Sequence, residues 1–328
     1  MEHRIRELYN KSILNNTLSR YNIDKKNCHL LDGFESYVYQ IEKNNEQYIL
    51  KISHSIRRDK TMIEGEAHFI NYLSNHGLTI PQVIYSSNNN LIETIPAEEG
   101  YFTSTLFQHA PGKPPNKQSW NKYLFITMGK YLGKLHSISK TYAPVTKYRP
   151  DIFKESEAIV KFFPENDHDV KKIYNDLFTY FNSLPQDTDS FGLIHVDFHG
   201  GNFFINNGNI YLFDFDDCQY SWFVHDIAMA FFYSLPHHCE NNKQIENGYL
   251  FLNNFLKGYY QENNLDKEWL TKIPDFLKLR ELELYALINR SFDLNNLDPW
   301  SERFMKNRKE KIIQNIPFFD FDPEKLSL

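Results

Sequence analysis

The spacing of apolar residues changes once along the chain, and this change restricts the fold more than any other feature. Before residue 110, β-branched and aromatic residues gather in short runs such as LLDGFESYVYQIE and YILKIS, separated by Asn-, Pro- and Gly-containing turns. This pattern is typical of strands. After residue 116, apolar residues recur at helical intervals, first in Trp120–Leu135 and again in Val170–Phe181. We therefore expect an α+β fold with a small sheet lobe and a larger helical lobe.

The Pro- and Gly-bearing stretch APGKPP marks the predicted boundary between the lobes. The N-terminal lobe is expected over residues 1–109 and the C-terminal lobe over 110–328, with a hinge at about 107–116. Within the first lobe, Met62–His76 has helical spacing and is followed by Gly77, a typical helix end. This lobe is therefore predicted to be an antiparallel sheet with one inserted helix.

Composition excludes several classes of protein. The chain has 328 residues, 41% of them apolar, and a net charge of −6 without clustered basic residues, which argues against binding to nucleic acid. Cys28, Cys218 and Cys239 are far apart and lack CxxC spacing, which favours reduced thiols in a cytoplasmic protein. No run of about 18 apolar residues occurs, so we expect no membrane span. The sequence leaves the oligomeric state open.

The segment from His195 to Asp217, HVDFHGGNFFINNGNIYLFDFDD, places four aspartates and two histidines among apolar residues. Buried carboxylates are costly unless they are paired, and a metal ion is a common partner. A Gly–Gly pair between Asp197 and Asn202 permits a tight turn, and FFINNGNIYLF predicts a hairpin that returns Asp214 to the same place. Phosphoryl transfer needs a carboxylate that orients the attacking hydroxyl and oxygen ligands for Mg²⁺, and these three residues supply them.

This segment resembles the aminoglycoside phosphotransferase and choline kinase-like superfamily. Members are relatives of the protein kinases, whose loops read H-x-D-x-x-x-x-N and then D-x-D or D-F-G. HVDFHGGN and FDFDD match those motifs in kind and spacing. The resemblance implies a two-lobed, protein kinase-like fold with a nucleotide-binding first lobe. It also implies that the γ-phosphoryl group of ATP is transferred, with Mg²⁺, to a hydroxyl of a small-molecule acceptor.

The resemblance also implies roles for residues of the segment. Asp197 would be the catalytic base, and His195 would brace the loop that carries it. Asn202 and Asp214 would bind Mg²⁺, while Asp216 or Asp217 would assist at the metal.

Looser motifs extend the resemblance to most of the chain. Lys51 in YILKIS is similar to the strand lysine that contacts the α- and β-phosphates, and Glu66 is similar to its helix partner. Gln108 and His109, within FQHAPG, would lie at the hinge beside the adenine. Asp226 in VHDIAMAFF is similar to the structural aspartate of the family, and LGKLHSIS to the helix end that precedes the catalytic loop.

The chain departs from the protein kinases in the loop that covers the nucleotide. Where a protein kinase has three glycines, this chain has only Gly33, in LDGFESYVY. We expect phosphate to be held there by backbone N–H groups and by Ser36.

Other interpretations stay open at this point. A protein serine/threonine kinase, or a kinase-like scaffold that binds nucleotide without turnover, would share the fold. H-x-D also begins an iron-binding triad of oxygenases, which would require a second histidine such as His225 or His237. The acceptor class is equally open among choline-, homoserine-, methylthioribose- and aminoglycoside-like alcohols. Arg280 and Arg290, ten apart in a predicted helix, are candidates to clamp an anionic acceptor, although structural roles are favoured for both.

Overall fold

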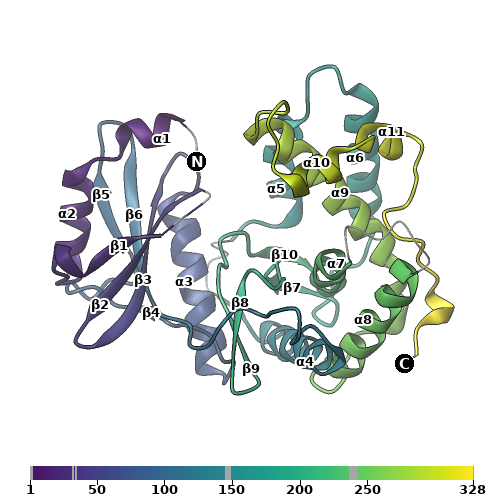
Figure 1. Cartoon of the computed structure of the whole chain (residues 1–328), viewed down its shortest axis with the longest axis horizontal. Coiled ribbons are helices and arrows are strands. Elements are labelled where there is room, and N and C mark those ends of the chain that lie inside the picture. Colours follow the sequence, from purple (N-terminus) through teal and green to yellow (C-terminus); the bar gives the residue numbers. More distant parts are fainter. Residues whose placement is uncertain (1–2, 32, 34, 145–148, 236–242, 328) are drawn as a thin grey trace. The chain divides into compact units, whose positions relative to one another are not determined.

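The computed structural model describes residues 3–31, 33, 35–144, 149–235 and 243–327, and the chain divides into two compact units (Figure 1). Unit 1 consists of Met1–Lys113, Ala143–Arg149 and Phe203–Asp216. Unit 2 consists of Pro114–Tyr142, Pro150–Asn202 and Asp217–Leu328. Each unit therefore combines segments that are distant in the sequence.

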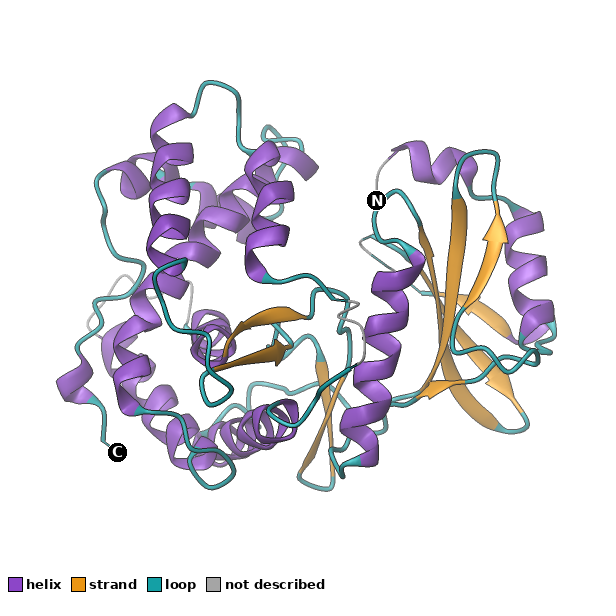
Figure 2. Ribbon diagram, turned by 180° about the vertical axis from the view of Figure 1, so that it is seen from behind, coloured by secondary structure: helices purple, strands orange, loops and turns teal. Residues whose placement is uncertain are grey.

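Unit 1 is built on a six-stranded antiparallel sheet, drawn in orange in Figure 2. The strand order is β1-β2-β3-β6-β4, and β5 also pairs with β6. The strands are β1 (Cys28–Leu30), β2 (Tyr37–Lys43), β3 (Glu46–His54), β4 (Val83–Ile84), β5 (Glu93–Pro96) and β6 (Tyr101–Gln108). The helices are α1 (His3–Leu8), α2 (Lys11–Arg20), the short 3-10 helix η1 (Lys25–Asn27) and α3 (Lys60–Asn75).

The polar turn between β2 and β3 explains the register of the central hairpin. Asn44 and Asn45 both have positive φ, 55° and 61°, so Lys43 pairs directly with Glu46. Two-residue turns of this kind match the twist of the strands that they join, and asparagine tolerates the left-handed backbone better than most residues. The hairpin fixes Lys51 in the middle of β3, opposite Val38 on β2.

Helices cover both faces of this sheet, with α2 and α3 on opposite sides in Figures 1 and 2. Ile13 and Leu18 of α2 join a core that includes Leu50 and Phe102 of the sheet. The helix expected at 62–76 is α3, which begins after its N-cap Asp59. Gly77 has the expected left-handed backbone, with φ of 84°. The two helices α1 and α2 arise from the polar start of the chain and precede the sheet.

A second hairpin also belongs to unit 1. Strands β8 (Phe203–Asn206) and β9 (Asn209–Leu212) are joined by Asn207 and Gly208, both with positive φ. This is the hairpin that the NNG sequence predicts. It ends two residues before Asp214, so the position of that carboxylate depends on the hairpin.

Unit 2 is mainly helical. Its helices are α4 (Lys122–Ser139), α5 (Ile152–Ile159), α6 (His168–Phe181), α7 (Phe223–Ser234), α8 (Lys243–Tyr259), α9 (Ile273–Ser291), α10 (Pro299–Met305) and α11 (Arg308–Ile313). Its 3-10 helices are η2 (Val160–Phe162), η3 (Lys267–Lys272) and η4 (Pro323–Lys325). Strands β7 (Phe191–Ile194) and β10 (Gln219–Trp222) form an antiparallel pair in which Ile194 faces Gln219.

Close packing of α4 against α8 depends on glycine. A Cβ atom at Gly129 would lie 1.8 Å from the carbonyl oxygen of Phe255, and one at Gly258 would lie 2.0 Å from that of Ile126. No side chain fits at these positions, so the two backbones pack directly against each other. This contact fixes α4, whose last turns carry His136.

Two expectations about the chain as a whole can be compared with the described residues. Among them, no helix is both long enough and apolar enough to cross a bilayer. Cys28 and Cys218 are free thiols, whereas Cys239 lies outside the described part of the chain.

Candidate active site

The loop that follows β7 is held by one buried carboxylate, that of Asp226 in the first turn of α7. This carboxylate accepts hydrogen bonds from the backbone N–H groups of His195 (2.9 Å) and Val196 (2.5 Å). It also bonds Nε2 of His136 at 3.1 Å. Asp226, His136 and His195 are all fully buried. Three hydrogen bonds to one anion compensate its burial and fix the start of the loop.

The loop backbone is strained where it meets Asp226. Val196 has φ of 72°, a conformation that is rare for a β-branched residue. The strain is explained by the N–H group of Val196, which must point at the buried carboxylate. His195 completes the turn, because its Nδ1 accepts a hydrogen bond from the N–H of Asp197 at 3.1 Å. His195 thus contacts the loop backbone, while the bracing role that the resemblance implies for it stays a prediction.

Replacing Asp226 by Asn is expected to lower the free energy of unfolding by about 3 kcal/mol at neutral pH, because an amide leaves buried donors without an anion. Burial by itself would raise the pKa of Asp226, but the hydrogen bond and charge of His136 outweigh burial and lower it. A lowered folded-state pKa stabilises the protein above about pH 4, and this stabilisation is lost as the pH falls through the folded-state value. The difference between variant and wild type should therefore shrink on acidification, as measured by urea unfolding.

A matched control is Asp189→Asn, since the Asp189 side chain is 88% exposed and forms a surface ion pair with Lys140. That variant should lower the free energy of unfolding by less than about 1 kcal/mol. Equal unfolding free energies for the two variants would contradict the anchoring role of Asp226.

The carboxylate of Asp197 is bonded at both oxygens. Oδ2 accepts hydrogen bonds from Asn202 Nδ2 at 2.8 Å and His199 Nε2 at 3.2 Å. Oδ1 accepts one from Nη2 of Arg280, in the middle of α9, at 3.0 Å. Burial would raise the pKa of Asp197, but the hydrogen bond from His199 and the charge of Arg280 outweigh it, so the pKa lies below its ordinary value. Asp197 is therefore an oriented, ionised carboxylate.

Asn202 is oriented by the same contacts. Its amide nitrogen donates to the carboxylate and also to the backbone carbonyl of Asp197, at 2.9 Å. With the nitrogen engaged there, the amide oxygen is the atom that remains for a hard cation such as Mg²⁺.

In unit 1, Lys51 is surrounded by three carboxylates. Its Nζ lies 2.9 Å from Asp216, 3.3 Å from Asp214 and 4.0 Å from Glu66. Burial lowers the pKa of Lys51, but the negative charge of Asp216 and the other carboxylates outweighs burial and raises it. Lys51 is thus a permanent cation, and in this structure it lies closer to Asp216 than to its expected partner Glu66.

Asp214 and Asp216 have different surroundings. The Asp216 side chain is 8% exposed and forms ion pairs with both Lys51 and Arg57. The Asp214 side chain is 55% exposed, and the backbone of Asp214 itself is left-handed, with φ of 63°. Arg57 also pairs with Glu35, so it connects Asp216 to the loop before β2. Asp214 is therefore the more accessible of the two carboxylates for a metal ion.

The predicted hinge residues have their backbone donors in use. The N–H of Gln108 donates to the carbonyl of Gln82 at 2.9 Å, and that of His109 donates to the carbonyl of Gln47 at 3.3 Å. The Gln108 side chain accepts a hydrogen bond from the Gln82 N–H at 3.1 Å. Adenine recognition by Gln108 and His109 would therefore use their carbonyl groups or the His109 ring.

Gly33 and Ser36 lie in the short loop before β2, whose residues 32 and 34 are outside the described part of the chain. A Cβ atom at Gly33 would lie 2.3 Å from the carbonyl oxygen of Ser36. Glycine at this position allows the loop to fold back on itself, and Ser36 is buried within it.

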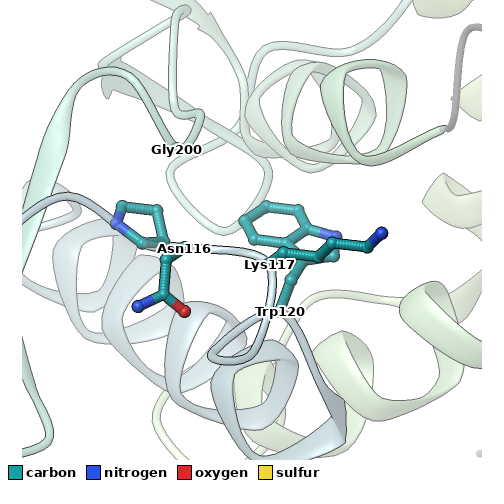
Figure 3. Close-up of a pocket in the computed structure, with 5 residues that line it drawn as sticks. Asn116, Lys117, Trp120 and Gly200 are labelled. Atoms are coloured by element: carbon teal, nitrogen blue, oxygen red, sulfur yellow. The ribbon is translucent and has the colours of Figure 1, made fainter.

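A small pocket of about 270 Å³ opens beside the H-x-D loop within unit 2. Figure 3 shows Trp120, Lys117 and Asn116 around it, with Gly200 of the loop opposite. Pro115 completes the lining, and a Cβ at Gly200 would approach it to 3.2 Å. The absence of a side chain at Gly200 helps to keep this space open.

Arg57 of unit 1 and Tyr233 of unit 2 were not singled out from the sequence, because no motif indicates either residue. Arg280 and Arg290 were candidates for an anion clamp, with structural roles favoured for both. Arg280 bonds Asp197, whereas Arg290 is exposed and its guanidinium lies over the Phe162 ring at 4.2 Å. Helical periodicity predicts the face of the helix on which an arginine lies, but it does not predict which side chain the arginine contacts.

Of the two histidines considered for an iron triad, the structure describes only His225. His225 is buried, bonds Ser221 at 3.0 Å and stacks on Phe276. His237 lies outside the described residues. Within the described ranges, no group of three or more His, Cys, Asp or Glu side chains could hold a metal ion.

A helical unit with an anchored H-x-D loop, and a sheet unit with a buried lysine among carboxylates, define a phosphotransferase of the protein kinase-like class. The model of the phosphotransferase enzyme family matches residues 28–259, and the chain belongs to this family. It is 33% identical to amicoumacin kinase of Bacillus subtilis (strain 168) over 322 residues, which cover 96% of this chain and 95% of that protein.

Solved structures agree with this assignment. Amicoumacin kinase hAmiN, solved in complex with AMP-PNP, Ca²⁺ and Ami, matches with a TM-score of 0.93 and 32% identity over 100% of both chains. A microcompartment-associated aminopropanol kinase matches with a TM-score of 0.72 and 18% identity, over 93% of this chain and 98% of that one. The second likeness concerns the fold alone.

The predicted family, the α+β kinase-like fold and the small-molecule phosphotransferase activity are thereby confirmed. The chain is a kinase that acts on a hydroxyl group of a small molecule. The protein kinase, inactive scaffold and iron oxygenase alternatives are not favoured.

Proposed function

We propose that the chain transfers the γ-phosphoryl group of ATP to a hydroxyl group of amicoumacin or a closely related antibiotic. The observation that carries this proposal is the similarity to amicoumacin kinases along the whole chain, at 32–33% identity and a TM-score of 0.93. The hAmiN complex contains AMP-PNP, an ATP analogue, together with a divalent cation and Ami. ATP and a divalent metal are accordingly the cofactors of this chain as well.

The residues described above suit this reaction. Asp197 is proposed to orient the acceptor hydroxyl and to accept its proton as the new P–O bond forms. Lys51 is proposed to contact the phosphates, with Glu66 beside it. Asn202 and Asp214 offer an amide oxygen and an exposed carboxylate, which are ligands that Mg²⁺ prefers. Mg²⁺ held by such ligands would neutralise charge on the phosphates.

Asp216, Gln108, His109, Gly33 and Ser36 keep their predicted contacts to metal or nucleotide as proposals. For Asp216 the competing role is structural, because Lys51 and Arg57 already occupy its carboxylate. A cytoplasmic location and the absence of a nucleic-acid partner also stay predictions.

The test is a phosphorylation assay with ATP, Mg²⁺ and amicoumacin. Its two readouts are the consumption of ATP and the mass of the acceptor. We expect ATP-dependent addition of one phosphoryl group to amicoumacin. The panel should also contain spectinomycin, an aminoglycoside, choline, 1-amino-2-propanol and a generic peptide, with Asp197→Asn protein as the control for contaminating kinases. Turnover of another acceptor without turnover of amicoumacin would refute the acceptor, and no turnover of any acceptor would refute the proposal.

A further inference from the structure

We propose that Arg280 is a positioning residue, which holds the Asp197 carboxylate in the orientation that phosphoryl transfer requires. This inference rests on the proposed role of Asp197 as the group that accepts the hydroxyl proton. It goes further by assigning a function to an arginine that no motif of the sequence connects with the catalytic loop.

The guanidinium of Arg280 is itself held in place. Nε donates to the hydroxyl of Tyr233, on the last turn of α7, at 3.0 Å, and Nη2 bonds the same hydroxyl. Its central carbon lies 5.3 Å from the centre of the Tyr233 ring. Nη1 lies 3.7 Å from the carboxylate of Glu283, on the same helix. Only 12% of the Arg280 side chain is exposed, so the guanidinium has little freedom to turn away from Asp197.

The contacts of Asp197 divide into two sets. Oδ2 is bonded by Asn202 and His199, which belong to the same loop and would move with it. Oδ1 is bonded by Arg280, which belongs to a separate helix. Arg280 therefore ties the carboxylate to the framework of unit 2. A carboxylate oxygen has two lone pairs, so Oδ1 can accept from Arg280 and still receive the acceptor hydroxyl.

The charges around Asp197 come from three elements. The loop contributes His195 and His199, α7 contributes Tyr233, and α9 contributes Arg280 and Glu283. Among these groups, Arg280 is the cation whose planar guanidinium holds the Asp197 carboxylate from outside the loop.

The experiment compares kcat and the acceptor KM of wild type, Arg280→Gln, Arg280→Lys and Arg290→Gln, using the acceptor that wild type turns over. For Arg280→Gln we expect kcat to fall by at least about tenfold while the acceptor KM stays within about twofold of wild type, because a misplaced carboxylate slows the transfer step without removing a contact to the acceptor. Arg280→Lys keeps the charge but loses the planar fork, so its kcat should lie between those of Arg280→Gln and wild type. Arg290→Gln removes an exposed arginine from the same helix and should behave as wild type.

Two results would overturn the proposal. One is an Arg280→Gln variant whose kcat stays within about a factor of two of wild type. The other is a rise confined to the acceptor KM, which would make Arg280 a substrate-binding residue. If Arg280→Gln does not fold, Tyr233→Phe together with Arg280→Lys decides, because both should lower kcat without changing the acceptor KM. Failure of wild type to use any acceptor would instead reject the proposed function.

Discussion

Asp197→Ala is expected to slow phosphoryl transfer by about 10²- to 10⁴-fold, the range typical of general acid–base groups. The affinity for ATP should change little, because the proposed contacts of Asp197 are to the acceptor hydroxyl rather than to the nucleotide. Steady-state kcat and calorimetric titration with ATP and Mg²⁺ measure the two quantities separately.

Asp197→Asn is the necessary companion, because alanine also leaves Arg280 without its buried partner and so affects stability. The amide keeps the shape of the side chain and removes its basicity. If kcat in the Asn variant stayed within a factor of a few of wild type, Asp197 would not be the base.

Asp214→Ala is expected to lower kcat/KM for ATP by about 10²-fold and to raise the Mg²⁺ concentration needed for half-maximal activity. The reason is that the exposed carboxylate of Asp214 is the proposed anionic ligand of the cation, whereas Asn202 offers a neutral oxygen. Chelation of divalent metal should abolish turnover in wild type. Mg²⁺ titrations of activity and of ATP binding are the relevant measurements.

The variant Asp216→Asn distinguishes the proposed roles of Asp214 and Asp216. If Asp216 serves mainly as the partner of Lys51 and Arg57, this variant should lose stability and ATP affinity but keep the wild-type Mg²⁺ dependence. A Mg²⁺ dependence that is unchanged in Asp214→Ala and altered in Asp216→Asn would reverse the two assignments.

The sequence predicts those parts of the fold that depend on local chemistry. Asn44 and Asn45 in one hairpin, Asn207 and Gly208 in another, and Gly77 after α3 all have the left-handed backbone that their residue types favour. Such turns are determined by a few neighbouring residues, and they can therefore be read without knowledge of the tertiary structure.

Contacts between distant segments were not predicted in the same way. Asp226 bonds residues 30 and 31 positions earlier and His136 90 positions earlier, so its role was inferred only from resemblance. Arg280 was noticed as a charged residue on a helix, but its partner lies 83 positions away. The nearest carboxylate to Lys51 is that of Asp216, 165 positions later in the chain. These pairings depend on how helices and strands pack, which residue spacing alone does not encode.

The discontinuous make-up of the two units limits how such an enzyme can be divided or recombined. The chain passes between them at 113/114, 142/143, 149/150, 202/203 and 216/217. A gene fusion with a single crossover point therefore cannot exchange one complete unit for that of another kinase. Chimaeras that keep Asp214 and its hairpin with the native sheet need at least a double crossover around residues 203–216. New acceptor preferences are accordingly more accessible to point substitution than to the shuffling of whole modules.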